Sequence, residues 1–201
     1  MGAIFQSLGR TITAGVVLLI VLLLIIVGAA GARISIGEHA WWFFGMRWLH
    51  VAAGVMWIGL LWYFNFVQTP SMPKIPDDQK PAISKVIAPA ALFWFRWAAM
   101  ATIILGLILA AMAGYLGQAL MFQKPVTGIG IGMWLGIVMW FNVWFIIWPN
   151  QKKALGIVQV SPEEKPKAAR IAGMASRFNT MLSIPMLYFM VAQSHGGIAY
   201  P

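Results

Sequence analysis

The sequence predicts an all-α integral membrane protein with five transmembrane helices. Of its 201 residues, 61% are hydrophobic and only 9% are charged, whereas soluble domains carry roughly 25% charged residues. The apolar residues also fall into runs long enough to cross a bilayer. Because a chain in lipid must satisfy its backbone hydrogen bonds internally, such runs form helices. We therefore expect residues 1–201 to form a single membrane domain.

The first two spans follow from apolar runs with different borders. The first, about residues 11–32, lies between Arg10 and Arg33 and carries no charge. It is long enough to span, so we expect it to be retained and not cleaved as a signal peptide. Val, Leu and Ile cover all its sides, so we expect a peripheral helix that faces lipid or a partner. The second span, about residues 41–66, begins at a pair of tryptophans, which is typical of a membrane boundary.

The other three spans are expected to form a four-helix core with the second. The third, about residues 88–116, follows a proline-rich segment that we expect to be an ordered loop, and it has small residues at every fourth position. The fourth, about residues 128–148, has a similar glycine ridge and is expected to end at Pro149. Small-residue ridges of this kind mark close helix contacts in lipid. The fifth, about residues 169–193, follows a Ser-Pro-Glu-Glu capping sequence.

Basic residues predict the orientation in the membrane. Cytoplasmic loops carry an excess of Lys and Arg, so we expect a multi-pass protein of the bacterial inner membrane with a cytoplasmic N-terminus and a periplasmic C-terminus. Topology then explains the net charge of +9, and we expect no nucleic-acid partner. Arg33 and Lys124 fall on the predicted outer side, and the predicted inner side holds Arg10, Lys74, Lys80, Lys85, Lys152, Lys153, Lys165, Lys167 and Arg170.

Missing residue types exclude several kinds of chemistry. The sequence has no cysteine, which excludes disulfides, thiolate metal sites, a catalytic cysteine, iron–sulfur clusters and covalently attached c-type haem. It also has no phosphate loop, no nucleophile elbow and no pair of acids within a span. No catalytic residue is therefore assigned, and whether the chain is an enzyme stays open.

His50 is the most informative residue of the sequence. It lies inside the second span, roughly 13 Å from the outer end of that helix at 1.5 Å per residue. Burial favours the neutral imidazole, which is the metal-binding form. Gly54 and Trp57 share its helix face, and Gly54 leaves room for a flat ligand. Arg47, one turn outward, is placed to pair with a haem propionate. The alternative is a histidine that bonds only to a neighbouring helix.

His195 is the candidate for a second haem ligand. It ends the fifth helix on the same outer side as His50, although the two depths differ by about two helical turns, which helix tilt would close. The alternative is a solvated tail histidine, and we expect His39 to be solvated as well. A different outer-face metal site would combine Glu38, His39 and His195.

Besides Arg47, other arginines lie within the predicted spans, among them Arg96 and Arg177. Ionisable side chains inside a bilayer are costly and are hypotheses for function by default. We expect Arg96 and Arg177 to have a structural role, shared with asparagines whose amides bond across helices. Binding of an anion or a lipid headgroup is the alternative. The asparagines are Asn65, Asn142 and Asn179.

Three stretches resemble the membrane domain of bacterial cytochrome-linked urate hydroxylases. They are RWLHVAAGVMWIGLLWYFNFVQTP from Arg47 to Pro70, FNVWFIIWPNQKK from Phe141 to Lys153, and SIPMLYFMVAQSH from Ser183 to His195. A looser likeness, in the spacing of His50, Trp57 and Gly59, is to the haem-b protoporphyrinogen oxidases and copper-resistance membrane proteins. There the matching histidine is a haem ligand or a candidate ligand.

The resemblance implies a redox membrane domain in which His50 and then His195 bind haem b. The urate hydroxylases have more membrane helices and a C-terminal cytochrome c domain, whereas this sequence has no Cys-x-x-Cys-His motif. We therefore expect an electron-transfer or oxidoreductase-type subunit that works with a separate cytochrome-type carrier or other membrane subunits. The alternative is a cofactor-free accessory subunit of a larger membrane complex. A transporter or channel is a third hypothesis, but no charged pathway supports it.

Overall fold

The computed structural model describes residues 2–200, and these residues form helices and no strands. The predicted all-α class is confirmed. The chain divides between Trp42 and Phe43 into two compact units. The first unit contains α1 (Gly2–Phe5) and α2 (Leu8–Ala30).

The α2 helix has no buried residue. Apolar side chains on every side of a helix suit lipid, where no aqueous face is needed. The helix ends because Gly31 adopts the left-handed conformation, with φ of 67°, and its N–H bonds to the carbonyl of Ile26. Glycine takes this conformation without a Cβ clash and is the usual residue after a helix end.

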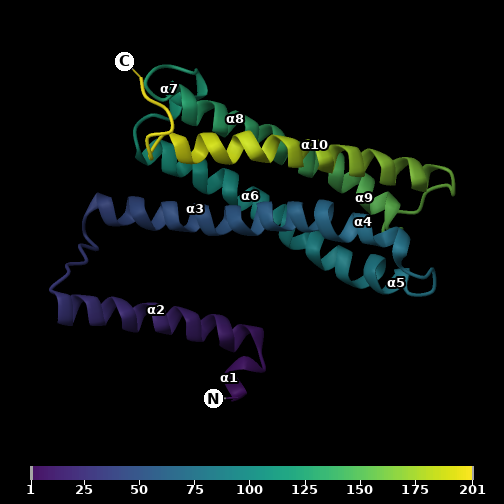
Figure 1. The fold of residues 1–201 in the computed structure, drawn as a ribbon, viewed down its shortest axis with the longest axis horizontal. Coiled ribbons are helices and arrows are strands. Elements are labelled where there is room, and N and C mark those ends of the chain that lie inside the picture. The colour runs from purple at the N-terminus through teal and green to yellow at the C-terminus, as the bar shows by residue number, and fades with distance from the viewer. Residues whose placement is uncertain (1, 201) are drawn as a thin grey trace. The chain divides into compact units, whose positions relative to one another are not determined.

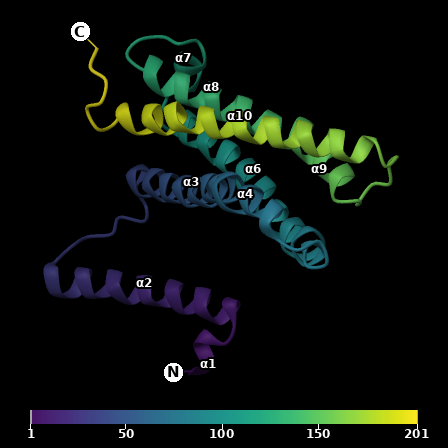
Figure 2. The ribbon, with the colours of Figure 1, turned by 45° about the vertical axis from the view of Figure 1, so that its right-hand side comes forward.

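Four long helical runs build the second unit, and α10 lies along α8 and α9 in both views (Figures 1 and 2). Three of these runs contain a short π-helical segment, in which the helix is wider and its hydrogen bonds join residues i and i+5. The α-helices are α3 (His39–Trp62), α4 (Thr69–Ser71), α5 (Lys80–Ala82), α6 (Ala88–Met112), α7 (Leu116–Leu120), α8 (Thr127–Phe141), α9 (Trp148–Ala154) and α10 (Glu164–Ala192). The π-helical segments are Tyr63–Gln68, Ile83–Ile87 and Asn142–Ile147, and Met72–Lys74 is a 3₁₀ turn.

Four helices of the described chain are long and apolar enough to cross a membrane. They overlap the first four predicted spans, although the first helix ends at Ala30 and the third at Met112, earlier than expected. The fifth predicted span overlaps α10, which ends at Ala192 and is not one of these four. Its first half carries Lys165, Lys167, Arg170 and Arg177. The count of five spans is therefore not confirmed. The four helices are Leu8–Ala30, His39–Lys74, Lys80–Met112 and Thr127–Ala154.

Two expectations about the helix ends were wrong. Pro149 does not end the fourth helix, which continues as α9, and most of the proline-rich segment between the second and third spans is helical. The physical reason is the same in both places. A proline ring clashes with the carbonyl four residues earlier and donates no N–H. Each π-helical segment precedes a proline by two residues and widens the helix at that carbonyl, so the chain passes Pro70, Pro89 and Pro149 without breaking.

Amide side chains connect the helices across the core, as the sequence predicts. Asn142 donates its Nδ2 hydrogen to Oδ1 of Asn179 at 2.8 Å, and Asn179 donates to the carbonyl of Met139 at 2.9 Å. In the π-helical segment that follows α3, Asn65 donates its Nδ2 hydrogen to Oγ of Ser176 on α10 at 2.8 Å. Asn179 is fully buried, so these bonds satisfy groups that would otherwise be costly in an apolar interior.

The small-residue ridges do lie at helix contacts. A Cβ on Gly132 of α8 would lie 3.3 Å from the backbone nitrogen of Met190 on α10, and one on Gly136 would lie 3.7 Å from Ile103 on α6. The serine of the expected capping sequence accepts a hydrogen bond from the Glu164 N–H at 3.3 Å, although α10 begins only at Glu164 and its N-cap residue Glu163 makes no side-chain cap bond. Backbone contacts this close need the small residues that the sequence supplies.

Candidate cofactor site

A cavity of about 560 Å³ lies within the second unit, between α3, α6, α8 and α10. We call it the histidine cavity because His50 and His195 both line it. Its volume is in the range of ligand pockets, which is roughly 300–1,000 Å³. All five residues that the sequence suggested for a cofactor line this one space: Arg47, His50, Gly54, Trp57 and His195.

The neighbouring helix α6 fixes the ring of His50. Its Nδ1 lies 2.9 Å from the carbonyl oxygen of Thr102. A carbonyl can only accept, so Nδ1 carries the proton and Nε2 of the neutral ring keeps its lone pair. Histidines that bind metals are commonly oriented by a backbone carbonyl in this way. The bond to the neighbouring helix therefore uses one nitrogen and leaves the other for a ligand.

Glycine at position 106 makes room for this ring. A Cβ built on Gly106 would lie 2.8 Å from Cε1 of His50 and 3.1 Å from its Nδ1, which is closer than side-chain atoms pack. Gly54 has more space, since its Cβ would meet only Thr102, at 3.9 Å. The four-residue spacing of Thr102 and Gly106 thus places two features on the same face of α6. They are the carbonyl that accepts the His50 hydrogen bond and the space that the His50 ring occupies.

His195 has a similar hydrogen bond in a more open position. Its Nδ1 lies 3.0 Å from the carbonyl oxygen of Val191, one turn back along the chain. The same argument assigns the proton to Nδ1 and leaves Nε2 with a lone pair when the ring is neutral. The side chain is exposed, just beyond the end of α10 at Ala192. The cavity therefore extends from His50, inside α3, to His195, beyond the end of α10.

Arg47 and Tyr115 add donors to the lining of the cavity. The Arg47 guanidinium lies over the ring of Phe43, with Cζ 4.6 Å from the ring centroid, and its side chain is exposed. Burial raises the pKa of Tyr115, and the charge of Arg47 acts in the opposite direction. Tyr115 is therefore a neutral phenol at pH 7. Together the two side chains supply a cation and an O–H donor, which suit the carboxylates of a ligand.

Apolar side chains complete the walls. Trp57 is 1% exposed, and its Nε1 has no hydrogen-bond partner among the described residues. Three methionines from α8 and α10 also line the cavity, and their thioethers are soft and adaptable. Sequence reasoning singled out neither these methionines nor Tyr115 for a site. The methionines are Met133, Met186 and Met190.

Other candidates of the sequence lie elsewhere. Arg96 is buried, and its Cζ lies 3.3 Å from the ring centroid of Trp148, a cation–π contact that fits a structural role. His39 is not among the residues that line the histidine cavity. No three His, Asp or Glu side chains between residues 2 and 200 gather around a point suited to a metal ion. This gives no support to the alternative outer-face metal site.

The lining of the histidine cavity fits haem b. His50 has a free Nε2 in a ring held by Thr102, and Gly106 provides the space in which that ring lies. Arg47 and Tyr115 supply donors of the kind that bind propionates, and the remaining walls are mostly apolar. Iron in b-type haem is held by imidazole without any covalent thioether link, so the lack of cysteine is no obstacle.

We expect Gly106→Ala to disturb the site without unfolding the protein. The new methyl group would push the His50 ring away from Thr102 and move Nε2. Losing an orienting bond of this kind lowers metal-site affinity by about 10- to 100-fold. Haem content and the visible spectrum of the purified variant measure the effect. Gly45→Ala, where a Cβ meets no atom within 4 Å, is the matched control, and an equal spectrum in both variants would contradict the assignment.

One family model matches part of this chain. It describes the N-terminal domain of urate oxidase and covers residues 118–201, which is less than half of the chain. The match includes α8, α9, α10 and His195, whereas His50 and α6 lie outside it. No curated protein and no solved structure matches the chain significantly.

Proposed function

We propose that the protein is a haem-b-binding electron-transfer or oxidoreductase-type membrane subunit that works with a separate redox partner. The observation that carries this proposal is the histidine cavity, in which all five residues singled out from the sequence line one mostly apolar space. The free Nε2 of His50 supplies a ligand atom. The partial match to the urate oxidase N-terminal domain supports a redox family.

Each lining residue has a stated task in this proposal. His50 binds through Nε2, and Thr102 holds its ring in the required tautomer. His195 is the second ligand, Gly54 leaves room for a flat ring, and Trp57 excludes water from one side. Haem supplies an iron centre that takes up and releases one electron. The protein sets its potential through ligation, burial and hydrogen bonds to the ligands.

A spectrum of the wild-type protein tests the proposal. The protein is purified in mild detergent, reduced with dithionite and recorded between the Soret and α bands, with iron measured in parallel. We expect a sharp α band and about one haem per chain. A folded, colourless preparation without iron would instead favour the accessory-subunit hypothesis. For that hypothesis the supporting observation is α2, an apolar helix that has no buried residue.

The proposed orientation has its own test. A periplasm-dependent reporter fused after Pro201 is expected to be active, as is a cytoplasm-dependent reporter inserted near Lys153. The reason is the surplus of Lys and Arg on the side of Lys153. Reporter activity in vivo is the measurement. If a reporter after Pro201 instead shows that this end is cytoplasmic, either the orientation or the number of spans is wrong. Whether α10 spans the membrane then decides between these two explanations.

A further inference from the structure

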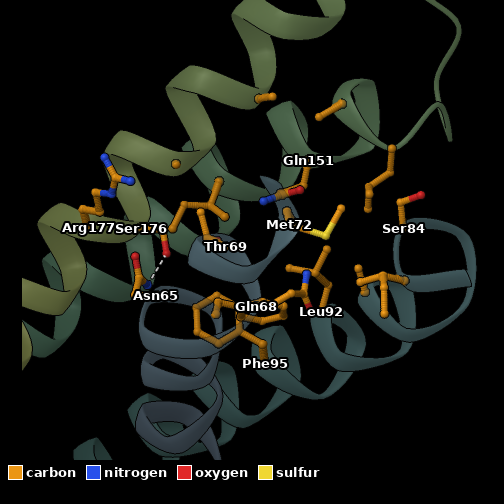
Figure 3. A pocket seen from close by; sticks show the side chains of 18 residues that line it. Asn65, Gln68, Thr69, Met72, Ser84, Leu92, Phe95, Gln151, Ser176 and Arg177 are labelled. Atoms are coloured by element: carbon orange, nitrogen blue, oxygen red, sulfur yellow. Dashed lines mark hydrogen bonds between the residues drawn. The ribbon is translucent and has the colours of Figure 1, made fainter. Parts of the chain in front are cut away.

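A second cavity, of about 280 Å³, lies at the other end of the same helices. We call it the amide cavity, after Asn65, Gln68 and Gln151 in its lining. The residues that line it fall in 64–95 and 147–177, whereas those of the histidine cavity fall in 47–62, 102–137 and 186–195. Figure 3 shows Gln68 between Phe95 and Met72, with Arg177 at the edge of the group.

Widened helices surround the amide cavity. Each of the three π-helical segments contributes lining residues, among them Gln68, Ser84 and Ile147. A π turn is an unfavourable conformation that occurs frequently at functional sites. Here three proline-bearing helices each place one at the same cavity. The arrangement keeps this end of the second unit open although its helices pack closely elsewhere.

The polar lining of the amide cavity is almost free of charge. Asn65 and Ser84 are satisfied within the protein, by Ser176 and by the carbonyl of Lys80. In contrast, Oε1 of Gln68 is buried and has no partner among the described residues. A buried acceptor without a donor is destabilising. A ligand that brings an O–H to this atom, after the Gln68 side chain rotates to turn its amide oxygen toward the cavity, removes that penalty.

Charge excludes two ligand classes. Among residues 2–200, no carboxylate lines the amide cavity, so a cation would find no counter-ion there. In the same part of the chain Arg177 is the only ionisable residue of the lining, and it is exposed, so a phosphate or carboxylate would have a single solvated partner. The ligand class that remains is one whose polar group is neutral. The apolar side of the lining includes Phe64 and Phe95, whose rings meet edge to face with centroids 5.8 Å apart, and such aromatic walls suit a flat ring.

We propose that the amide cavity binds the ring of a membrane quinol. A quinol is neutral and flat, carries two O–H donors and has an apolar tail that stays in the lipid. One hydroxyl donates to Oε1 of Gln68, and the ring lies against Phe64 and Phe95. This binding requires no haem, so it stands or falls separately from the function proposed for the histidine cavity.

The test is anaerobic calorimetric titration of the full chain in nanodiscs with duroquinol. We expect saturable binding to the wild type and about tenfold weaker binding to Gln68→Leu, because the variant removes the acceptor. Gln79→Leu makes the same change at an exposed residue outside the cavity and is expected to bind like the wild type. The dimethyl ether of duroquinol, which has no O–H, is expected to bind as weakly to the wild type as duroquinol does to Gln68→Leu.

A second variant keeps the proposal testable if Gln68→Leu is unstable. Gly173 lines the amide cavity, and a Cβ there meets no atom within 4 Å. Gly173→Val therefore adds side-chain volume at a lining position that has room for a Cβ, and it is expected to abolish binding. Equal binding of duroquinol and its ether, or equal binding to the wild type and Gly173→Val, would overturn the proposal. Native mass spectrometry that finds a retained phospholipid, displaced by neither quinol, would assign the cavity to a lipid instead.

Discussion

His50→Ala is expected to remove the haem from the purified protein. The substitution deletes the Nε2 ligand and leaves the Thr102 carbonyl facing an enlarged apolar cavity. With no cysteine in the chain, nothing links the cofactor covalently. We expect the α band of the reduced protein to fall to background and the bound iron to fall with it. Size-exclusion chromatography verifies that the variant is folded.

His39→Ala is the matched control for this experiment. His39 lies on the same helix as His50 but outside the lining of the histidine cavity, so the control is expected to keep a wild-type spectrum. If His50→Ala also keeps it, His50 is not the ligand and the proposed function loses its main support.

The second ligand is resolved by two further variants. His195→Ala is expected to change the spectrum from that of a six-coordinate to that of a five-coordinate haem while much of the haem stays bound. Met190→Leu, which removes a thioether from the same cavity with little change in volume, is expected to leave the spectrum unchanged. The reverse result would assign the second ligand to Met190, since methionine is also a common axial ligand.

The sequence was sufficient to predict the helical class, and it singled out five residues that line one cavity. A histidine within an apolar span, with glycine and arginine at helical spacing, is a local pattern, and local patterns can be read without a structure. The orienting partner of His50 could not be found in this way, because the carbonyl of Thr102 belongs to another helix and backbone groups have no sequence signature. The spacing of Thr102 and Gly106 suggested only a packing ridge.

The helix ends were less predictable than the helices. Proline usually stops a helix, so the expected end of the fourth span at Pro149 followed a sound rule. The rule failed because a π turn two residues earlier relieves the proline clash and lets the helix continue. Nothing in the composition of Asn142–Ile147 distinguishes a π turn from ordinary helix. The amide cavity is lined in part by three such segments, so it could not be predicted from the sequence for the same reason.

Gly130→Ala is expected to destabilise the protein strongly. A Cβ on Gly130 of α8 would overlap the backbone carbonyl oxygen of Ala119 on α7. Because the obstacle is backbone, no rotamer change relieves it, and the two helices must move apart. Ala119 is fully buried in a cluster with Ile129 and Met133, so the movement would open a packed region. We expect a loss of about 3 kcal/mol, at the upper end for overpacking.

Thermal unfolding of the detergent-solubilised protein measures this loss, and Gly117→Ala is the control. Gly117 lies on α7 as well, but a Cβ there meets nothing within 4 Å, so the control is expected to melt with the wild type. Ile129 and Met133 also line the histidine cavity. Separation of α7 from α8 should therefore lower haem occupancy together with the melting temperature. A Gly130→Ala variant that melts like Gly117→Ala would show that α7 does not pack on α8, and the cavity would then need another wall.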